Sequence, residues 1–358
     1  MQKNLQRNNL FKIGKFTINK KKTFIIAEIS ANHNRSFQRV INLLKKAKES
    51  GADAVKLQAY TPDTITINSN NQDFRLDHLK DSKWSKYKNF YSLYKIGTLN
   101  WDWYKKIFNY AKKIGLEIFA SPFDESAVDM LEELDCVSYK IASAEINHIP
   151  LLIKVAKTKK PVIISTGLAS LKDINTAIKV LIKHGNKKIA LLKCNSSYPA
   201  PINESNMKNI SYLINKYKLP VGLSDHSIGN SASIAAVTLG ACIIEKHFNL
   251  DDKAKTLDDF FSTKVKDFKI MVNQIRETEE LLGNYYYSIS KSSIKNLKAR
   301  RSIYISNDIK INDKINKDNV KVVRPGMGLD PKFYYKILGK KSKKNLKKGS
   351  RLKLSYLK

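Results

Sequence analysis

The sequence alternates eight times between short apolar runs rich in β-branched residues and stretches with helical periodicity. The apolar runs cover residues 24–30, 54–60, 116–121, 137–142, 161–166, 189–194, 220–224 and 241–247. Helical spacing of apolar residues is clearest before Gly51, Gly185 and Gly283, which are placed to end their helices. Buried strands that alternate with helices form parallel βαβ units. Eight such units predict an α/β fold, the (β/α)8 TIM barrel.

A doubly wound open sheet is the alternative, but its usual Gly-x-Gly-x-x-Gly turn after the first strand is absent.

We expect residues 1–283 to form the barrel domain with a short N-terminal extension, 284–296 a linker, and 297–358 a small second domain. Residues 61–100 form an aromatic-rich insertion after the second strand. Connections of this length are often functional, so the insertion is a candidate cover for a bound substrate.

The chain is strongly basic, and its charge is dominated by lysine. It contains 65 Lys and Arg against 32 Asp and Glu, for a formal net charge of +33, and only nine of the basic residues are Arg. Arginine is the side chain that most often recognises guanine bases by hydrogen bonds, so a composition poor in arginine disfavours sequence-specific binding to nucleic acid. Residues 284–358 nevertheless carry 21 basic and 4 acidic side chains. A nucleic-acid-binding protein that uses this tail is therefore the alternative from another functional class.

The cysteines indicate a reducing compartment. Cys136, Cys194 and Cys242 are far apart and form no Cys-x-x-Cys pair, which disfavours a disulfide framework or a structural zinc site. Cys194 is expected to be a small core residue.

The N-terminal segment is polar and basic through Lys22, and no window approaches the roughly 20 apolar residues of a membrane span. We expect a cytoplasmic protein without membrane or nucleic-acid partners.

Reactive side chains gather at the carboxyl ends of the predicted strands, where the loops of a TIM barrel converge on the active site. Lys56 and Lys140 lie inside apolar runs, where an unpaired ammonium is costly to bury, so an anionic ligand would supply the missing partner. Hydroxyl side chains at these ends would suit a phosphate or carboxylate, although each alone more often caps a helix. They are Ser121, Ser143, Ser165 and Ser224.

Two histidines end neighbouring strands of the predicted barrel. His226 follows the seventh strand and His247 ends the eighth. A single histidine is more often a hydrogen-bonded core residue, but adjacent strands lie about 4.8 Å apart, so two imidazoles could share one ion. Two imidazoles completed by oxygen ligands suit a divalent first-row metal. No Gly-x-Ser-x-Gly elbow or Walker lysine loop is present.

Taken in order, these segments resemble the sialic acid synthase family. The barrel motifs are FIIAEISANHN (24–34), GADAVKLQAYTPDT (51–64), FASPFD (119–124), YKIASAEI (139–146), VIISTGLA (162–169), LLKCNSSYPAP (191–201), GLSDHSIG (222–229) and EKHFNLD (245–251). The tail motifs RRSIYISNDI (300–309) and VVRPGMGLDPKFYYKILGKK (322–341) resemble the family's antifreeze-like SAF domain. The resemblance covers the chain from about residue 11.

The resemblance implies a transferase that condenses phosphoenolpyruvate with an open-chain N-acetylated amino sugar to give a nine-carbon 2-keto acid and phosphate. His226 and His247 would bind Mn²⁺ or Mg²⁺, which would polarise the sugar aldehyde. The expected homodimer would place Arg324 of one SAF domain over the barrel of the other chain. Phosphoenolpyruvate would be held by Lys56, Ser121, Lys140, Ser143, Ser165, Ser196 and Ser224.

The same resemblance implies a set of sugar contacts and a base. Glu145 would be the base for the attacking water, within about 3 Å of it. Phe123 would line the site beside Ser121. The sugar contacts would be Glu28, Gln58, Glu145, Tyr198 and Asp258. The DDKAKTLDDFFS loop departs from the family pattern, because it lacks the Gly-Pro that the family places before Asp258.

The segments TPDT, ISANHN and DDFFS are more similar to pseudaminic acid synthases than to other members of the family. Their substrate would be 2,4-diacetamido-2,4,6-trideoxy-L-altropyranose. The alternative is an N-acetylneuraminate or legionaminate synthase that applies the same mechanism to another sugar.

Overall fold

The computed structural model describes residues 11–18, 22–79 and 82–358, so the N-terminal extension expected at 1–10 lies outside the described residues. The chain divides into two compact units, Met1–Gly283 and Asn284–Lys358. Each unit has its own cluster of buried apolar side chains. The first unit holds the alternating strands and helices, and the second carries the basic tail.

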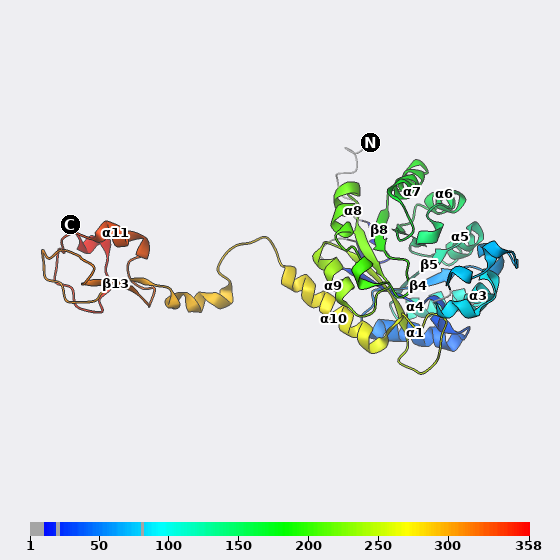
Figure 1. The fold of residues 1–358 in the computed structure, drawn as a ribbon, viewed down its shortest axis with the longest axis horizontal. Helices are drawn as coiled ribbons and strands as arrows, with labels where there is room; N and C mark the ends of the chain where they lie inside the picture. Colours follow the sequence, from blue (N-terminus) through cyan, green and yellow to red (C-terminus); the bar gives the residue numbers. More distant parts are fainter. Residues whose placement is uncertain (1–10, 19–21, 80–81) are drawn as a thin grey trace. The chain divides into compact units, whose positions relative to one another are not determined.

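Eight parallel strands close into a barrel in the first unit (Figure 1). Each strand pairs with the next along the chain, and β10 pairs with both β9 and β3, which completes the circle. The strands are β3 (Phe24–Glu28), β4 (Ala54–Ala59), β5 (Glu117–Pro122), β6 (Tyr139–Ile141), β7 (Val162–Ser165), β8 (Ile189–Cys194), β9 (Val221–Asp225) and β10 (Ile243–Asn249). The predicted TIM barrel is therefore confirmed, with strand ends within two residues of those expected.

One principal helix follows each barrel strand and packs an apolar face on the outside of the sheet. These helices are α1 (Phe37–Glu49), α4 (Tyr104–Lys113), α5 (Glu125–Glu132), α6 (Ile149–Lys157), α7 (Leu171–Lys183), α8 (Asn209–Tyr217), α9 (Ser231–Thr238) and α10 (Val265–Leu282). Val40 and Leu44 of α1 are fully buried, as their spacing predicts. Ser170 and Asp173 form a capping box at the start of α7, and Gly185 follows its end at φ +83°.

The insertion after β4 folds into short helical segments. These are α2 (Pro62–Ile65), α3 (Phe90–Gly97) and the 3₁₀ turns Gln72–Phe74, Asp77–Leu79 and Lys83–Lys86, followed by Trp101–Trp103 before α4. His33 Nε2 lies 3.2 Å from the carbonyl oxygen of Gly97, and the Thr98 hydroxyl donates to the Tyr60 carbonyl at 2.7 Å. The insertion is thus anchored to the carboxyl ends of β3 and β4.

Smaller elements complete the first unit. β1 (Lys12–Ile13) and β2 (Phe16–Thr17) form an antiparallel hairpin, and β11 (Thr263–Lys264) pairs with the end of β10. Short 3₁₀ helices lie in loops after three strands, at Ser30–His33, Ser143–Glu145 and Ile202–Glu204. No helix in the described parts of the chain is long and apolar enough to span a membrane.

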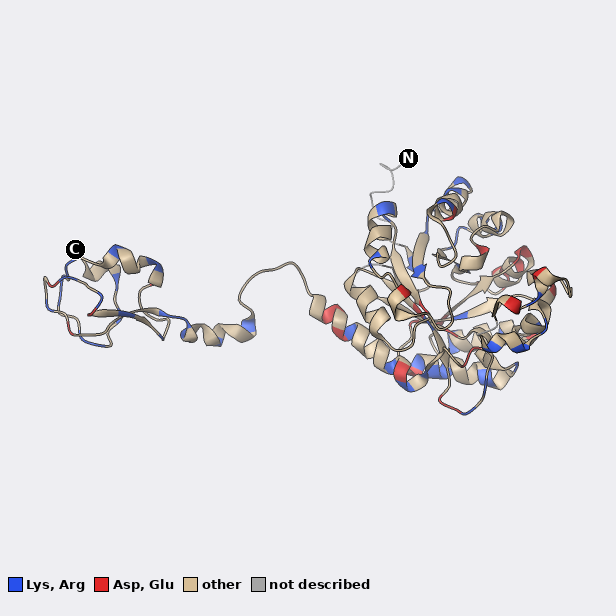
Figure 2. Ribbon diagram, in the orientation of Figure 1, with Lys and Arg blue, Asp and Glu red and all other residues tan. Residues whose placement is uncertain are grey.

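The second unit contains few regular elements. β12 (Ser302–Ile305) and β13 (Val320–Val323) pair antiparallel, and α11 (Tyr334–Ile337) is a single turn. Three 3₁₀ segments, Lys291–Ala299, Pro331–Phe333 and Leu354–Tyr356, complete it. Ile303, Ile305 and Ile337 belong to its core. Lys and Arg occur on helices around the barrel and along this unit rather than on one element (Figure 2).

Candidate active site

A cavity of about 400 Å³ lies at the carboxyl ends of the barrel strands. Fifteen of the sixteen site residues expected from sequence line it: Glu28, Lys56, Gln58, Ser121, Phe123, Lys140, Ser143, Glu145, Ser165, Ser196, Tyr198, Ser224, His226, His247 and Asp258. Arg324 is the exception, because it lies in the second unit, where its side chain is exposed. The convergence follows from parallel strands that all end at the same rim.

The floor of the cavity is a buried ion network centred on Glu245. Its Oε1 accepts hydrogen bonds from Lys56 Nζ and Lys140 Nζ, both at 2.9 Å, and from the Ser224 hydroxyl at 3.0 Å. Lys56 Nζ also lies 3.3 Å from Glu28 Oε2. The expectation that the two lysines lack a protein partner was therefore wrong. Glu245 compensates their charge because its side chain points inward from β10.

The network distributes positive charge unevenly. Burial lowers the pKa of Lys56, but the nearby carboxylates of Glu245 and Glu28 outweigh burial, so the pKa is raised overall. Burial and the charge of Lys56 lower the pKa of Lys140, and Glu245 and Cys194 offset them only in part. Burial raises the pKa of Glu28 to about 7, so this carboxyl is partly protonated near neutrality. The network therefore contains two ammonium groups but only one fully ionised carboxylate, and this excess of positive charge favours binding of an anion.

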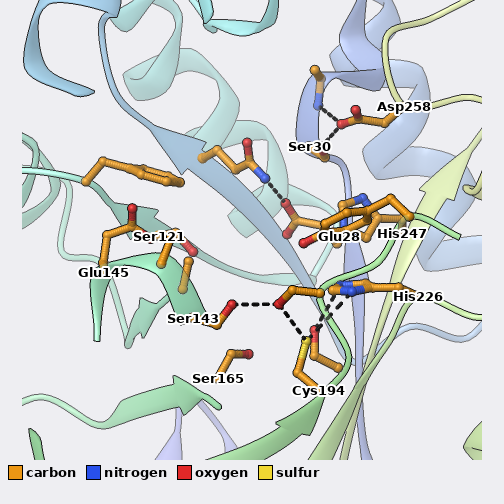
Figure 3. A pocket seen from close by; sticks show the side chains of 18 of the residues that line it. Glu28, Ser30, Ser121, Ser143, Glu145, Ser165, Cys194, His226, His247 and Asp258 are labelled. Atoms are coloured by element: carbon orange, nitrogen blue, oxygen red, sulfur yellow. Dashed lines mark hydrogen bonds between the residues drawn. The ribbon is translucent and has the colours of Figure 1, made fainter. Parts of the chain in front are cut away.

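Hydroxyl groups with unused hydrogen-bonding capacity surround this floor. The buried Oγ atoms of Ser121 and Ser165 have no hydrogen-bond partner within the described residues. Ser143 Oγ and Ser196 Oγ lie 2.9 Å apart. Buried hydroxyls normally find partners, so the two free ones are available for a ligand. Figure 3 shows Ser121, Ser143 and Ser165 on the side of the cavity opposite Glu28. A phosphate or carboxylate matches these donors.

His226 and His247 face the same part of the cavity (Figure 3), with ring centroids 5.3 Å apart. His226 Nδ1 lies 2.7 Å from the carbonyl oxygen of Asn195, and its Nε2 lies 3.3 Å from the Ser224 hydroxyl. His247 Nδ1 is buried without a hydrogen-bond partner within the described residues, and burial lowers the pKa of this ring well below its usual value. Burial lowers the pKa of His226, but Cys194 and the Asn195 carbonyl outweigh burial and raise it overall. The unpartnered Nδ1 of His247 therefore fits a divalent metal as it stands, and His226 would bind the ion once it is neutral.

The described residues provide no group of three His, Cys, Asp or Glu side chains arranged around a metal position. An ion between His226 and His247 would therefore complete its coordination with water or substrate oxygens. Divalent first-row metals accept such mixed nitrogen and oxygen ligands. The two histidines thus fit a catalytic metal with open positions better than a closed structural site.

Glu145 has the properties of a general base. It ends the 3₁₀ helix Ser143–Glu145, and its buried Oε2 has no hydrogen-bond partner within the described residues. Burial raises its pKa to about 7, while the positive charges of Lys140 and Lys56 act in the opposite direction. A carboxyl group that titrates near neutrality suits proton transfer at physiological pH.

Asp258 lies in the cavity wall despite the unusual loop that precedes it. It accepts hydrogen bonds from the Ser30 hydroxyl and, at 3.2 Å, from the backbone N–H of Ala31. Burial raises its pKa, although the hydrogen bond with Ser30 acts against this effect. These contacts fix the loop to the carboxyl end of β3.

Sequence reasoning missed several residues of the cavity. Glu245 was recognisable, because it lies two positions before His247 and so shares its face of the strand. Cys194 was expected only in the core, but it lines the cavity and its Sγ lies 3.7 Å from His226 Nδ1. The insertion contributes lining residues that no strand pattern could place, among them Trp84 and Tyr94.

Comparison with known proteins agrees with this geometry. Residues 43–287 match the NeuB family and residues 300–357 match the SAF domain. A pseudaminic acid synthase from Campylobacter jejuni is 42% identical over 95% of this chain and 98% of its own length. An N,N'-diacetyllegionaminic acid synthase from the same organism is 38% identical over 91% of this chain and 98% of its own length. The crystal structure of an N-acetylneuraminic acid synthetase from Leptospira borgpetersenii has a TM-score of 0.69 at 29% identity, covering 80% of this chain and 95% of that one.

Proposed function

Because the chain belongs to the NeuB family, the sialic acid synthases that its motifs resemble, we propose that it is a phosphoenolpyruvate-dependent transferase of nonulosonic acid biosynthesis. Its substrates would be phosphoenolpyruvate, 2,4-diacetamido-2,4,6-trideoxy-L-altropyranose and water, and its products pseudaminate and phosphate. The observation that carries the reaction class is the cationic, hydroxyl-lined floor beside the imidazoles of His226 and His247. The 42% identical pseudaminic acid synthase supports the choice of sugar.

Phosphoenolpyruvate is an anion, so it would bind on the floor of the cavity. Lys56 and Lys140 would neutralise its charge, and the hydroxyls of Ser121, Ser165 and Ser196 would donate to its oxygens. The Glu245 carboxylate offsets part of the repulsion between the two lysines. Such fixed positive groups cost no reorganisation during the reaction.

Carbon 3 of phosphoenolpyruvate would attack carbon 1 of the open-chain sugar, forming the new carbon–carbon bond. The aldehyde oxygen becomes a hydroxyl, for which Glu28 holds a proton at its raised pKa. Glu145 would take a proton from the water that adds at carbon 2. The resulting tetrahedral carbon then loses phosphate by cleavage of its carbon–oxygen bond. Gln58, Phe123, Tyr198 and Asp258 would position the sugar.

A divalent ion, Mn²⁺ or Mg²⁺, bound by His226 and His247 would act as a Lewis acid toward the aldehyde oxygen. The 5.3 Å separation of the two ring centroids in the cavity and the unpartnered Nδ1 of His247 support this assignment. Dialysis against chelator should abolish activity, and Mn²⁺ or Mg²⁺ should restore it. Activity that persists in excess chelator would contradict the metal requirement.

We further propose a homodimer in which the SAF unit contributes Arg324 to the partner's cavity. The exposed tyrosines Tyr285, Tyr286 and Tyr287, at the start of the second unit, support an interface in this segment. Mixing refolded Arg324→Ala and His226→Ala chains tests the proposal. Heterodimers would contain one intact site, and statistical mixing predicts about a quarter of wild-type activity. No activity above the sum of the two variants would exclude contribution in trans.

We infer a cytoplasmic location from the same family and from the thiols. Cys136 and Cys194 are buried free thiols. Free thiols are typical of a reducing compartment.

The experiment that tests the function is turnover of three sugars side by side. Phosphate release from phosphoenolpyruvate should be fastest with the diacetamido-trideoxy-altrose sugar. The legionaminate precursor is the second candidate, supported by the 38% identical diacetyllegionaminic acid synthase. Faster turnover of that precursor or of N-acetylmannosamine would reassign the substrate, and no release with any of them would reject the function.

A further inference from the structure

The insertion after β4 forms a second wall of the cavity, chemically unlike the floor. Its lining residues are Ile65, His78, Leu79, Trp84, Phe90, Leu93 and Tyr94. Apart from His78 and the Tyr94 hydroxyl, these described side chains offer apolar surface to the cavity. Leu257 and Phe261, from the loop after β10, continue this surface. The part of a substrate that meets this wall must therefore be largely apolar.

Trp84 joins the insertion to the loop after β10. Its indole Nε1–H donates to the carbonyl oxygen of Leu257 at 3.1 Å, so the polar atom of the side chain is already satisfied. The ring lies edge-on to Phe261, with centroids 5.9 Å apart, and its centroid is 5.5 Å from that of Tyr198. These contacts leave the indole half-buried, and its remaining surface lines the cavity. A ring held on three sides is a preorganised binding surface.

The position of Trp84 identifies which end of the substrate it meets. Its contacts lie in loops that carry Tyr198 and Asp258, whereas the lysines and Glu245 lie on strands at the floor. A phosphoenolpyruvate on the floor leaves the wall to the sugar. The proposed sugar carries three methyl groups, at carbon 6 and on two acetamido groups. N-acetylmannosamine has hydroxyls at carbons 4 and 6, which the apolar side chains of the wall could not hydrogen-bond.

We propose that Trp84 is a substrate-binding residue whose indole face receives the methyl-bearing end of the sugar. The inference rests on the proposed function and deepens it, because it explains how a deoxygenated, doubly acetylated sugar is recognised. Binding of apolar groups to a preformed apolar surface needs no new polar contact. The sugar site is thus divided between polar groups that hold the reacting carbon and an aromatic wall that holds the far end.

Trp84→Ala tests the proposal through the two Michaelis constants. The KM for the diacetamido sugar should rise about tenfold, the lower part of the range for small apolar contacts in a specificity pocket. The KM for phosphoenolpyruvate should stay within about twofold, because the floor is unchanged. An equal rise of both constants, or no rise in the sugar KM, would overturn the proposal. If wild-type enzyme released no phosphate with this sugar, the proposed function would fail instead.

Two further variants test whether a rise in the sugar KM reflects a lost contact with the sugar rather than damage to the fold. Trp84→Phe keeps an aromatic ring but loses the hydrogen bond to Leu257, and it should raise the sugar KM by a smaller factor than alanine. It carries the test if the alanine variant does not fold, and an unchanged sugar KM would then overturn the proposal. Trp103→Phe is the matched control, because Trp103 packs against Phe37 and does not line the cavity. It should leave both constants unchanged, and a rise of the sugar KM equal to that in Trp84→Phe would overturn the proposal.

Discussion

The floor and the insertion wall of the cavity are built in opposite ways. The floor consists of charged side chains on barrel strands, and Lys56, Lys140 and Glu245 are each less than 5% exposed. The wall consists of aromatic and aliphatic side chains on short helical segments, and Trp84 there is only half-buried. Under the proposed function, the rigid strands of the floor would hold the groups that react, and the insertion wall would select the sugar.

Removal of Glu245 should have the largest effect. Glu245→Ala leaves Lys56 and Lys140 buried without their carboxylate, which should lower the free energy of unfolding by about 3–5 kcal/mol. Turnover should fall by at least about 10³-fold, since the anion site loses its geometry. Denaturant unfolding and phosphate release measure the two effects.

Asp225→Ala provides the matched control for Glu245→Ala. Asp225 also pairs with a buried lysine, Lys246, at 2.7 Å, but neither side chain lines the cavity. It should lower stability comparably and affect turnover far less. Equal losses of turnover in both variants would remove the distinction between the floor and the rest of the barrel.

The double variant His226→Ala His247→Ala should rank next. It removes both imidazoles that would hold the divalent ion, and turnover should fall by about 10²- to 10³-fold, which corresponds to several kcal/mol of charge stabilisation. Elemental analysis should find wild-type chains retaining about one equivalent of metal and the variant retaining none. Equal metal contents would contradict the assignment of the site.

Glu145→Gln should have an effect of about 10²-fold that depends on pH. A base must be ionised, so wild-type kcat/KM should rise as pH increases through about 7, the pKa of Glu145. Glu28 acts as the acid in this account and must stay protonated, so activity should fall again above a similar pH. The glutamine variant should lose the rising limb and keep the falling one. A variant with an unchanged rising limb would exclude Glu145 as the base.

The same raised pKa has a consequence for stability. The folded-state pKa of Glu145 lies above the value of an exposed glutamate, so its favourable contribution is present at low pH and is lost as pH rises through about 7. Glu145→Gln should therefore make the unfolding free energy less dependent on pH between about 5 and 8. An unchanged pH dependence would show that the carboxyl titrates normally.

The smallest expected effect concerns the wall and its selectivity. Wild-type kcat/KM for N-acetylmannosamine should be at least about tenfold below that for the diacetamido sugar, because its hydroxyls meet apolar side chains. Leu79→Asn should reduce the difference in kcat/KM between the two sugars, because its amide can hydrogen-bond the hydroxyls of N-acetylmannosamine. A ratio near one in the wild type would mean that the wall does not select the sugar.

Most residues of the floor could be predicted from the sequence, whereas the residues of the insertion wall could not, and the reason is physical. Strand periodicity and the common rim of parallel strands determined where Lys56, Ser165 and His247 would lie, so short apolar runs were enough to place them. Glu245 was given no role because the sequence does not show that its carboxylate meets Lys56 and Lys140, which lie 189 and 105 residues away along the chain. The contribution of Trp84 depends on contacts 173 residues away along the chain, with Leu257, which no local pattern contains.

The central claim is that water, activated by Glu145, adds to carbon 2 of a phosphoenolpyruvate held on the floor after the sugar has reacted. Phosphoenolpyruvate labelled with ¹⁸O in the oxygen that joins carbon 2 to phosphorus tests it directly. With the diacetamido sugar and Mn²⁺, mass spectrometry should find the label in the released phosphate, because the carbon–oxygen bond breaks. Label retained in the nine-carbon product, or phosphate released without any sugar, would contradict the account.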